Sequence, residues 1–213
     1  MVKVPWIIKR IFKDLVWKIP TREKVLYLTF DDGPHPTATP FVLEELKKYN
    51  ARATFFCLGK NVAAHPAIYS SIMQAGHAVG NHTFNHLNGW KVNDKQYFQD
   101  IVEAKKYIDS SLFRPPYGKI TPFQAKHLKE SPLSFDIIMW DVLSKDYDVT
   151  LTARDCSFNV VRHAQPGSIV VFHDSEKAWP RMQGALTETL KYFSENGWTF
   201  AELDEKSEGE VEE

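Results

Sequence analysis

Cysteine is scarce in this chain of 213 residues, and its two cysteines, Cys57 and Cys156, lie far apart in the sequence. They form neither a CxxC pair nor a zinc-knuckle spacing, which argues against a disulfide framework and against a cysteine-based metal site. Cys57 lies inside the apolar run 53–58, which has the composition of a buried strand. We therefore expect both cysteines to be small, reduced core residues.

A charge excess of either sign is also lacking, because 26 basic and 27 acidic residues leave a net charge of -1. Nucleic-acid-binding proteins normally show a basic excess or a basic stripe, so this balance argues against a nucleic-acid partner. With 43% hydrophobic and 25% charged residues, the composition is that of an ordinary globular protein. Its length suits one domain with a full hydrophobic core.

Long apolar runs are missing from residues 1–20, where lysines and arginines interrupt the hydrophobic residues. This segment has no small-residue cleavage site and is too short and too charged to span a bilayer, so we predict neither a signal peptide nor a membrane span. On that basis we predict a cytoplasmic protein. A basic amphipathic segment suits peripheral contact with an anionic membrane. The alternative is a purely structural role, as an arm that packs back over the domain. Both interpretations stay open at this stage.

We divide the chain into a basic amphipathic arm at 1–20, a single catalytic domain at 21–204 and an acidic tail at 205–213. The tail lacks apolar anchors, so we predict a solvated, flexible end. The sequence shows no internal repeat, and it makes no prediction about oligomeric state.

From residue 23 onward, apolar runs alternate with amphipathic stretches of helix length, which is typical of an α/β architecture with parallel strands. The predicted strands are 25–30, 53–57, 78–81, 112–114, 135–140, 168–173 and 198–203. The predicted helices are 37–49, 66–75, 94–110, 121–129, 151–164 and 183–195. Several strands are continuous apolar runs, as expected where helices cover a parallel sheet. Seven strands in one domain of this size indicate a compact or incomplete barrel.

Reactive side chains fall where the predicted strands end. They are Asp31, Asp32, His82, Arg114, Asp141, Asp146 and His173. The carboxyl ends of parallel strands form one rim, and active sites of α/β barrels and open sheets are built there. We therefore expect five separate segments to converge on one face.

His82 and His86 are four residues apart, so one helical turn would place both imidazoles on the same side. Such a pair is a weak signal by itself. A carboxylate from the same rim completes a set of two histidines and one carboxylate with open positions, which catalytic zinc and some non-haem iron sites share.

Asp31 and Asp32 stand together at the end of an apolar strand, before Gly33 and Pro34. A turn or helix cap needs only one aspartate. Two adjacent carboxylates repel each other, and a divalent cation relieves that repulsion, with one carboxylate as ligand and its neighbour as base. This pattern favours a functional role over a turn.

Two further segments reach the same rim. Residues 114–118 read Arg-Pro-Pro-Tyr-Gly, a stiff segment that can direct Arg114 at a carboxylate and a backbone amide at a substrate oxygen. His173 ends a buried strand, where it is either a satisfied core histidine or a catalytic one oriented by Asp141 or Asp146.

With these residues together, the sequence resembles the polysaccharide deacetylase family, the NodB-homology domain of carbohydrate esterase family 4, over roughly residues 24–203. The resemblance implies a distorted seven-stranded (β/α) barrel. It implies that Asp31 is the general base, that Asp32, His82 and His86 bind the metal, and that Arg114 steadies the base. It also implies that His173 is the general acid, oriented by Asp146.

The resemblance places Tyr117, through its backbone amide, and Pro116 at the substrate oxyanion, with Tyr147 and Val171 also near the substrate. The chain departs from the family in its fourth motif, where Leu143 replaces an aspartate and Tyr147 replaces a tryptophan. In the fifth motif Val171 stands where a leucine often lines the acetyl pocket. These changes bear on substrate preference.

The implied activity is metal-dependent hydrolysis of the N-acetyl amide of a polysaccharide or oligosaccharide, with release of acetate. The substrate class is an N-acetylglucosamine-type glycan, such as peptidoglycan or chitin-like oligomers, and peptide bonds are not attacked. The cofactor is a divalent metal, Zn²⁺ first and Co²⁺, Ni²⁺ or Mn²⁺ as alternatives. Three other functions stay open: a deacylase of a lipid-linked sugar, a non-haem iron oxygenase, and a sugar-binding member of the fold without turnover.

Overall fold

The computed structural model describes residues 2–203, so the predicted acidic tail at 205–213 lies outside the described residues. Its helices are α1 (Trp6–Ile11), α2 (Ala38–Lys48), α3 (Gly59–Ala64), α4 (Pro66–Gln74), α5 (Asp94–Lys105), α6 (Pro122–Lys129), α7 (Ala153–His163) and α8 (Trp179–Glu195), with a short 3₁₀ turn η1 (Pro116–Gly118). Its strands are β1 (Val25–Asp31), β2 (Ala53–Cys57), β3 (Ala78–Asn81), β4 (Leu112–Phe113), β5 (Asp136–Ile137), β6 (Val142–Leu143), β7 (Ile169–His173) and β8 (Thr199–Phe200).

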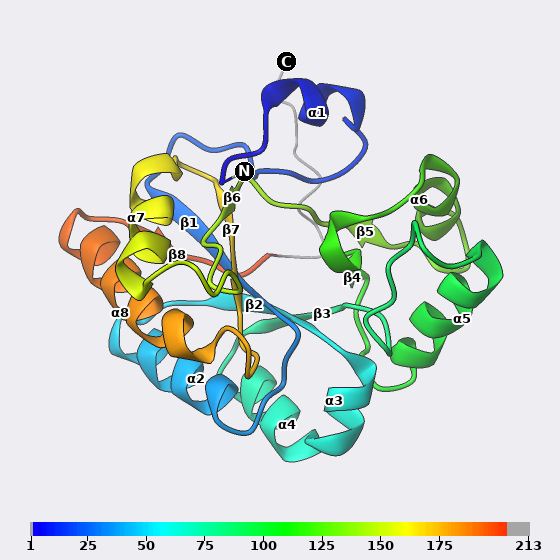
Figure 1. Cartoon of the computed structure of the whole chain (residues 1–213), viewed down its shortest axis with the longest axis horizontal. Helices are drawn as coiled ribbons and strands as arrows, with labels where there is room; N and C mark the ends of the chain where they lie inside the picture. The colour runs from blue at the N-terminus through cyan, green and yellow to red at the C-terminus, as the bar shows by residue number, and fades with distance from the viewer. Residues whose placement is uncertain (1, 204–213) are drawn as a thin grey trace.

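The strands form one curved parallel sheet in the order β5-β4-β3-β2-β1-β7-β6, and β8 pairs with β1 beside this path. Helices lie around the outside of the sheet, as Figure 1 shows. The predicted α/β barrel with seven strands along its wall is thus confirmed, in an open form. Among the described residues, β5 and β6 are the two ends of the path and do not pair with each other.

Central strands are mostly apolar because helices and the barrel interior cover both of their faces. All five residues of β2 are buried, and β1 is buried from Leu28 to Asp31. The aromatic rings of Phe30, Phe55 and Phe172 from β1, β2 and β7 stack across the sheet. Burying side chains of this size contributes roughly 1.5–3 kcal/mol each, which anchors the strand ends that carry the site.

Polar capping residues define where two of the helices begin. Thr121 and Gln124 form a reciprocal capping box at α6, and Thr152 and Asp155 form one at α7. Each box satisfies amide groups that the first helical turn leaves without a partner. These local signals explain why both helices begin close to their predicted positions.

Residues 2–19 form the arm, which packs on the barrel between the two ends of the sheet. Val16 donates to the carbonyl of Ile137 and accepts from the amide of Met139, next to β5. Ile19 donates to the carbonyl of Gly167 before β7, and Leu143 in β6 donates to the carbonyl of Val2. The packing alternative for the arm is therefore confirmed, and the arm bridges the opening of the barrel.

Side chains hold the arm in place as well. Leu15 and Trp17 are buried in the same hydrophobic cluster as Phe113 of β4 and Phe135 before β5. Lys9 of α1 forms an ion pair with the buried carboxylate of Asp141, which also accepts a hydrogen bond from Ser168 at 2.6 Å. Asp141 therefore anchors the arm and does not orient His173.

The structure differs from the predicted elements most clearly at two places. The single strand predicted at 135–140 is the shorter β5, and β6 follows it as a separate strand that the sequence analysis did not find. Helix α3 was also missed, because its six residues give too short a pattern to recognise.

Both cysteines are buried and unpaired, as predicted. Within residues 2–203, no helix has the length and apolar character that crossing a bilayer requires.

Candidate active site

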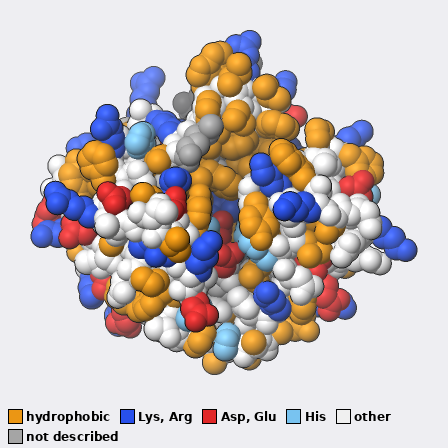
Figure 2. Space-filling model, viewed as in Figure 1, with side chains coloured by type: hydrophobic (Ala, Val, Ile, Leu, Met, Phe, Trp, Pro, Cys, Tyr) orange, Lys and Arg blue, Asp and Glu red, His pale blue; other side chains and the backbone are white. Residues whose placement is uncertain are grey.

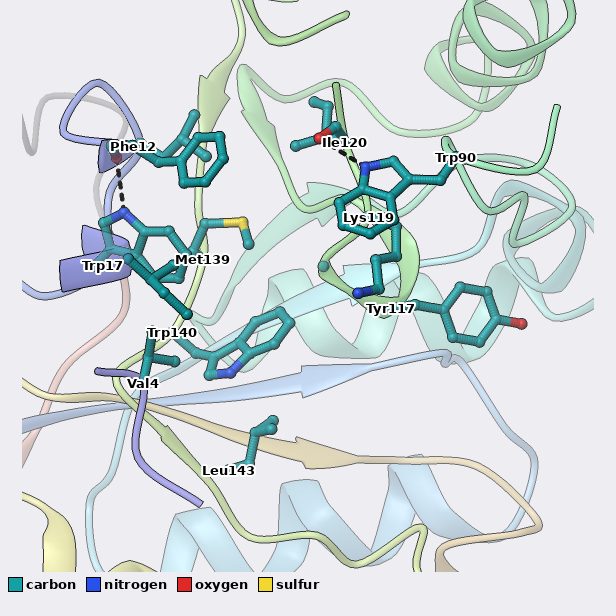
Figure 3. Close-up of a pocket in the computed structure, with 13 residues that line it drawn as sticks. Val4, Phe12, Trp17, Trp90, Tyr117, Lys119, Ile120, Met139, Trp140 and Leu143 are labelled. Carbon is teal, nitrogen blue, oxygen red and sulfur yellow. Dashed lines mark hydrogen bonds between the residues drawn. The ribbon is translucent and has the colours of Figure 1, made fainter. Parts of the chain in front are cut away.

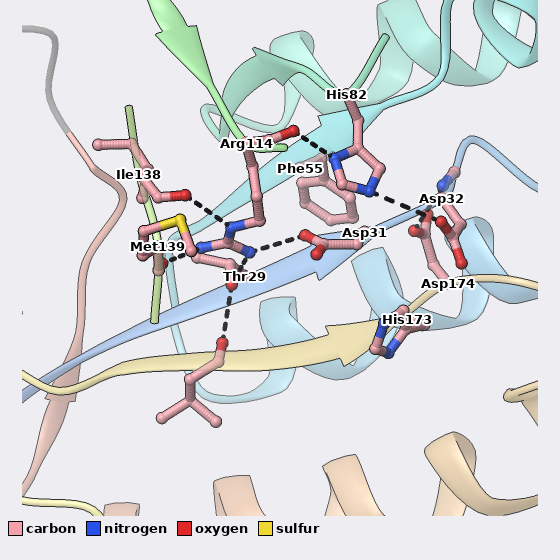
Figure 4. A network of polar contacts seen from close by, with 12 residues as sticks. Thr29, Asp31, Asp32, Phe55, His82, Arg114, Ile138, Met139, His173 and Asp174 are labelled. Atoms are coloured by element: carbon pink, nitrogen blue, oxygen red, sulfur yellow. Dashed lines mark hydrogen bonds and ion pairs between the residues drawn. The ribbon is translucent and has the colours of Figure 1, made fainter. Parts of the chain in front are cut away.

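Most of the predicted site residues meet in one pocket at the carboxyl ends of β1, β3 and β7. The cavity has a volume of about 480 Å³. It is lined by Asp32, His82, His86, Tyr117, Trp140, Leu143, Tyr147, His173, Ser175 and Lys177. Asp31 and Arg114 are buried beside it, with their side chains directed towards each other (Figure 4). The rim predicted from the strand ends is therefore the place where the reactive groups converge.

Asp32, His82 and His86 bring one donor atom each within 4.8 Å of the others. Oδ1 of Asp32 lies 3.2 Å from Nε2 of His86 and 3.8 Å from Nε2 of His82. Ligands held about 2.0–2.1 Å from a tetrahedral metal ion lie roughly 3.3 Å apart, so this spacing fits one ion. Oδ1 of Asp32 is buried and accepts no hydrogen bond from the described residues, which leaves it available as a ligand. The donor set fits a divalent metal.

The second nitrogen of each histidine is held by a neighbour. Nδ1 of His82 lies 2.8 Å from the carbonyl oxygen of Arg114, which can only accept, so Nδ1 carries the proton and Nε2 keeps its lone pair. Nδ1 of His86 lies 3.1 Å from the hydroxyl of Tyr117. These contacts orient both Nε2 atoms towards Asp32.

Both histidines are neutral at pH 7. Burial lowers the pKa of His82, although the carboxylates of Asp31 and Asp32 oppose this effect. Burial, together with the neighbouring His82, lowers the pKa of His86 to about 4. A metal ion binds the neutral imidazole, so the structure keeps both side chains in the form that binds.

The segment from His82 to His86 is an irregular loop, and the helical turn expected from the four-residue spacing is wrong. Thr83 and His86 have positive φ values of 66° and 63°, which no α-helix contains. Thr83 accepts a hydrogen bond from the amide of His86 at 2.9 Å, and Asp100 in α5 accepts from the amides of Phe84 and Asn85. Side-chain hydrogen bonds thus bring the two imidazoles together where a helix was expected to do so.

Asp31 forms a buried ion pair with Arg114, whose Nη1 lies 2.7 Å from Oδ1. The guanidinium donates three further hydrogen bonds, to Thr29 and to the carbonyls of Ile138 and Met139. The guanidinium also lies 4.1 Å from the ring centre of Phe56. A guanidinium held by these contacts fixes the carboxylate of Asp31 in one orientation, as a general base requires.

Hydrogen bonds to Asp174 hold the turn that carries Asp32. The sequence analysis did not single out Asp174. The carboxylate of Asp174 accepts from the amide of Gly33 at 3.0 Å and from the hydroxyl of Thr39 at 2.5 Å. A Cβ atom at Gly33 would lie 2.1 Å from this carboxylate, so only glycine fits here. Asp32 itself has a positive φ of 81°, and its carbonyl accepts from Asn61 at 2.7 Å. Strained backbone of this kind is typical of functional sites.

His173 is oriented by Asp146, one of the two carboxylates predicted for this role. Nδ1 of His173 lies 2.7 Å from Oδ1 of Asp146, and Oδ2 of Asp146 accepts from the backbone amide of His173 at 2.7 Å. Burial disfavours the charged imidazolium, but Asp146, Asp32 and Asp31 outweigh it and raise the pKa of His173 to about 9. His173 is therefore protonated at pH 7 and able to donate from Nε2.

The residues predicted to contact substrate divide into two groups. Tyr117 and Tyr147 line the pocket, and the ring of Tyr147 packs edge-on against His173 at 5.2 Å. Pro116 and Val171 are buried and do not line the described cavity. Leu143 lines it, at the position where the family has an aspartate. The departures at Leu143 and Tyr147 thus lie on the substrate side of the site, whereas the one at Val171 does not.

Three lining residues were missed from sequence: Trp140, Ser175 and Lys177. The indole N–H of Trp140 is buried and has no partner among the described residues. None of the three belongs to a motif with a characteristic spacing. The one sequence signal for them was their position, one to four residues after a strand or after a predicted site residue.

The family model for polysaccharide deacetylase matches residues 18–134. A peptidoglycan-N-acetylglucosamine deacetylase of Bacillus cereus is 34% identical over 197 residues, which cover 90% of this chain and 92% of that protein. The chain belongs to the polysaccharide deacetylase family. The predicted family and its deacetylase activity are thereby confirmed, and the iron oxygenase alternative is set aside.

Two further relatives support the assignment of this deacetylase. A chitooligosaccharide deacetylase of Azorhizobium caulinodans is 30% identical, with 81% of this chain and 86% of that protein covered. The crystal structure of the Bc1960 peptidoglycan N-acetylglucosamine deacetylase, in complex with 4-naphthalen-1-yl-N-oxidanyl-benzamide, has a TM-score of 0.85 and 30% identity. That match covers 94% of this chain and 95% of the other.

Proposed function

We propose that this deacetylase hydrolyses the N-acetyl group of N-acetylglucosamine residues in a glycan, with peptidoglycan and chitin-like oligomers as the substrate class. One observation carries the proposal: a metal-binding triad, a carboxylate paired with arginine and a histidine paired with aspartate all meet at one pocket. The relatives named as deacetylases of peptidoglycan and of chitooligosaccharides support the substrate class.

We propose zinc as the metal, held by Asp32, His82 and His86. Two imidazoles and one carboxylate with an open position are a common catalytic zinc set. When bound, such an ion polarises the acetyl carbonyl and lowers the pKa of water in the site. Cobalt, nickel and manganese accept the same donors, so metal analysis of the purified protein decides between them.

Two different residues of the chain carry out the two proton transfers of the reaction. Asp31, held in place by Arg114, accepts a proton from the attacking water. The backbone amide of Tyr117 donates to the oxyanion, and a donor of this kind is worth about 3–4 kcal/mol in other hydrolases. His173, protonated at neutral pH, donates its Nε2 proton to the leaving nitrogen. The products are acetate and a free amino sugar.

Replacing both His82 and His86 with Ala should remove the metal and the activity together. The remaining donor, Asp32, cannot hold an ion alone against water. Metal content is measured by mass spectrometry after dialysis, and acetate release is measured with chitotetraose as substrate. Replacing His127 and His163, which lie outside the pocket, serves as the matched control and should change neither quantity. A double mutant that keeps one metal ion per chain would refute the assigned ligands.

We also propose that α1 brings the protein to an anionic membrane surface. Trp6, Ile7 and Ile11 are 70%, 53% and 67% exposed, and Arg10 lies in the same helix, whereas Lys9 is engaged by Asp141. Exposed apolar side chains next to basic ones suit the boundary between headgroups and acyl chains. The cytoplasmic location expected from the sequence stays a prediction.

Changing Trp6, Ile7 and Ile11 together to Ser should lower binding to phosphatidylglycerol-containing vesicles by at least about tenfold, because the buried apolar area on the membrane is lost. Sedimentation with vesicles at low salt measures this. Deleting the arm is unsuitable, since Leu15 and Trp17 are part of the core. Serine at Val149, Phe158 and Tyr192, which are exposed elsewhere, should have no effect. Equal binding of all three proteins would remove the membrane proposal.

A further inference from the structure

A second cavity, apolar and about 370 Å³ in volume, lies between the arm and the rim of the barrel (Figure 3). It is lined by Val4, Ile8, Phe12, Leu15, Trp17, Trp90, Tyr117, Gly118, Lys119, Ile120, Met139, Trp140 and Leu143. Its volume is within the range of roughly 300–1,000 Å³ that small-molecule sites occupy. Five of the lining residues come from the arm, so the cavity exists only because the arm packs on the barrel.

This cavity adjoins the catalytic pocket. Tyr117, Trp140 and Leu143 line both. Leu143 makes the junction apolar at a position where an aspartate would place a charge. Figure 2 shows hydrophobic side chains gathered over α1, above the hollow where acidic and histidine side chains are visible. One ligand can therefore place a polar part at the triad and an apolar part under the arm.

The chemistry of the walls selects hydrocarbon over sugar. The indole N–H groups of Trp17 and Trp90 donate to the backbone carbonyls of Phe12 and Ile120, so neither is free for a hydroxyl. Lys119 is the one charged side chain on the described lining, and its ammonium lies 4.1 Å from the ring centre of Trp90. The indole N–H of Trp140 has no partner among the described residues and, with Lys119, is one of the few donors that a hydroxyl could meet here. The several hydroxyls of a sugar ring would therefore lose more hydrogen bonds to water than they gain, whereas a hydrocarbon chain gains from burial.

We propose that the cavity binds the hydrocarbon chain of a lipid to which the N-acetylated sugar is linked, so that the substrate is a glycolipid with its sugar at the triad. The inference rests on the proposed deacetylation and specifies its substrate. The exposed apolar side chains of α1 lie on the same arm that lines the cavity, so a membrane bound by α1 would bring such a lipid close to the cavity.

The test uses the methyl, butyl and octyl β-glycosides of N-acetylglucosamine, each below its micelle concentration, with chitotetraose as the lipid-free reference. Calorimetric Kd and the KM for acetate release should both fall with chain length, by at least about tenfold from methyl to octyl, because each buried methylene contributes up to about fourfold. The calorimetric arm needs no turnover, so failure of the deacetylase proposal leaves this test intact.

Ile8→Trp fills the cavity, and Ile7→Trp makes the same change at the neighbouring, exposed position. Ile8→Trp should abolish the fall of Kd and KM with chain length and leave chitotetraose hydrolysis unchanged. Ile7→Trp should retain the fall of both constants. A Kd that does not depend on chain length in the unmodified protein overturns the inference, even if Ile8→Trp fails to fold. Tighter binding of longer chitooligosaccharides that Ile8→Trp removes would also overturn it, since the occupant would then be a sugar ring.

Discussion

Asp31→Asn should lower kcat for acetate release by about 10²–10⁴-fold and leave the metal bound, because general-base catalysis contributes a factor of this size. The substituted amide keeps an oxygen that can accept from Nη1 of Arg114, which now contacts Oδ1 at 2.7 Å, so the geometry of the pocket is retained. The amide cannot accept a proton from water. Metal analysis and steady-state kinetics on chitotetraose measure the two quantities separately.

Asp32→Asn should give the opposite pattern, with weaker metal binding as the primary defect. It replaces an anionic oxygen, which accepts no other hydrogen bond among the described residues, with a neutral one. Asp109→Asn, at an exposed aspartate, is the matched control and should change neither metal content nor kcat. If Asp31→Asn loses the metal while Asp32→Asn keeps it, the two roles are reversed. If neither change affects hydrolysis, a sugar-binding protein without turnover becomes the better description.

Arg114→Met should destabilise the fold by about 3–5 kcal/mol, because it leaves the buried carboxylate of Asp31 without its counter-charge. Arg114 is fully buried, and its guanidinium also contacts Thr29 and two backbone carbonyls that would lose their donors. Urea unfolding followed by circular dichroism measures the change. Arg154→Met, at an exposed position, should stay within about 0.5 kcal/mol of the unmodified protein.

Adding Asp31→Asn to Arg114→Met separates charge from packing. Removing the carboxylate should recover part of the lost stability, since the uncompensated charge is then gone, and the double-mutant cycle gives the coupling between the two residues. Additive losses, with no recovery, would show that packing and backbone contacts of Arg114 carry its contribution and that the ion pair does not.

The central strands were predictable because their signal is local. The ranges predicted for β2 and β3 agree with the structure. For β2 the reason is a continuous run of buried residues between helices, which has one favourable place in a parallel sheet. The two-residue strands β4, β5 and β6 were placed loosely or missed. Their pairing depends on neighbouring strands and on the arm, and no local pattern of two residues records such contacts.

The chemical groups of the site were predictable because strand ends share one rim. Asp32, His82, His86 and His173 meet there, as expected. The predicted local structure between His82 and His86 was wrong. Thr83 and Asp100 hold a loop there, where the spacing indicated a helical turn. The choice between Asp141 and Asp146 as partner of His173 also needed the structure, since both follow the same predicted strand.

The sequence by itself determined the family, the α/β architecture and the identity of the groups that carry the chemistry, because short motifs and strand periodicity are properties of neighbouring residues. Only the tertiary structure decided that the arm bridges the barrel, that Asp141 binds Lys9, and that Trp17 and Trp140 enclose an apolar cavity beside the triad. These features join residues more than a hundred positions apart in the chain or in separate elements. Burial of apolar surface selects such contacts, and this term depends on the whole fold rather than on any local pattern.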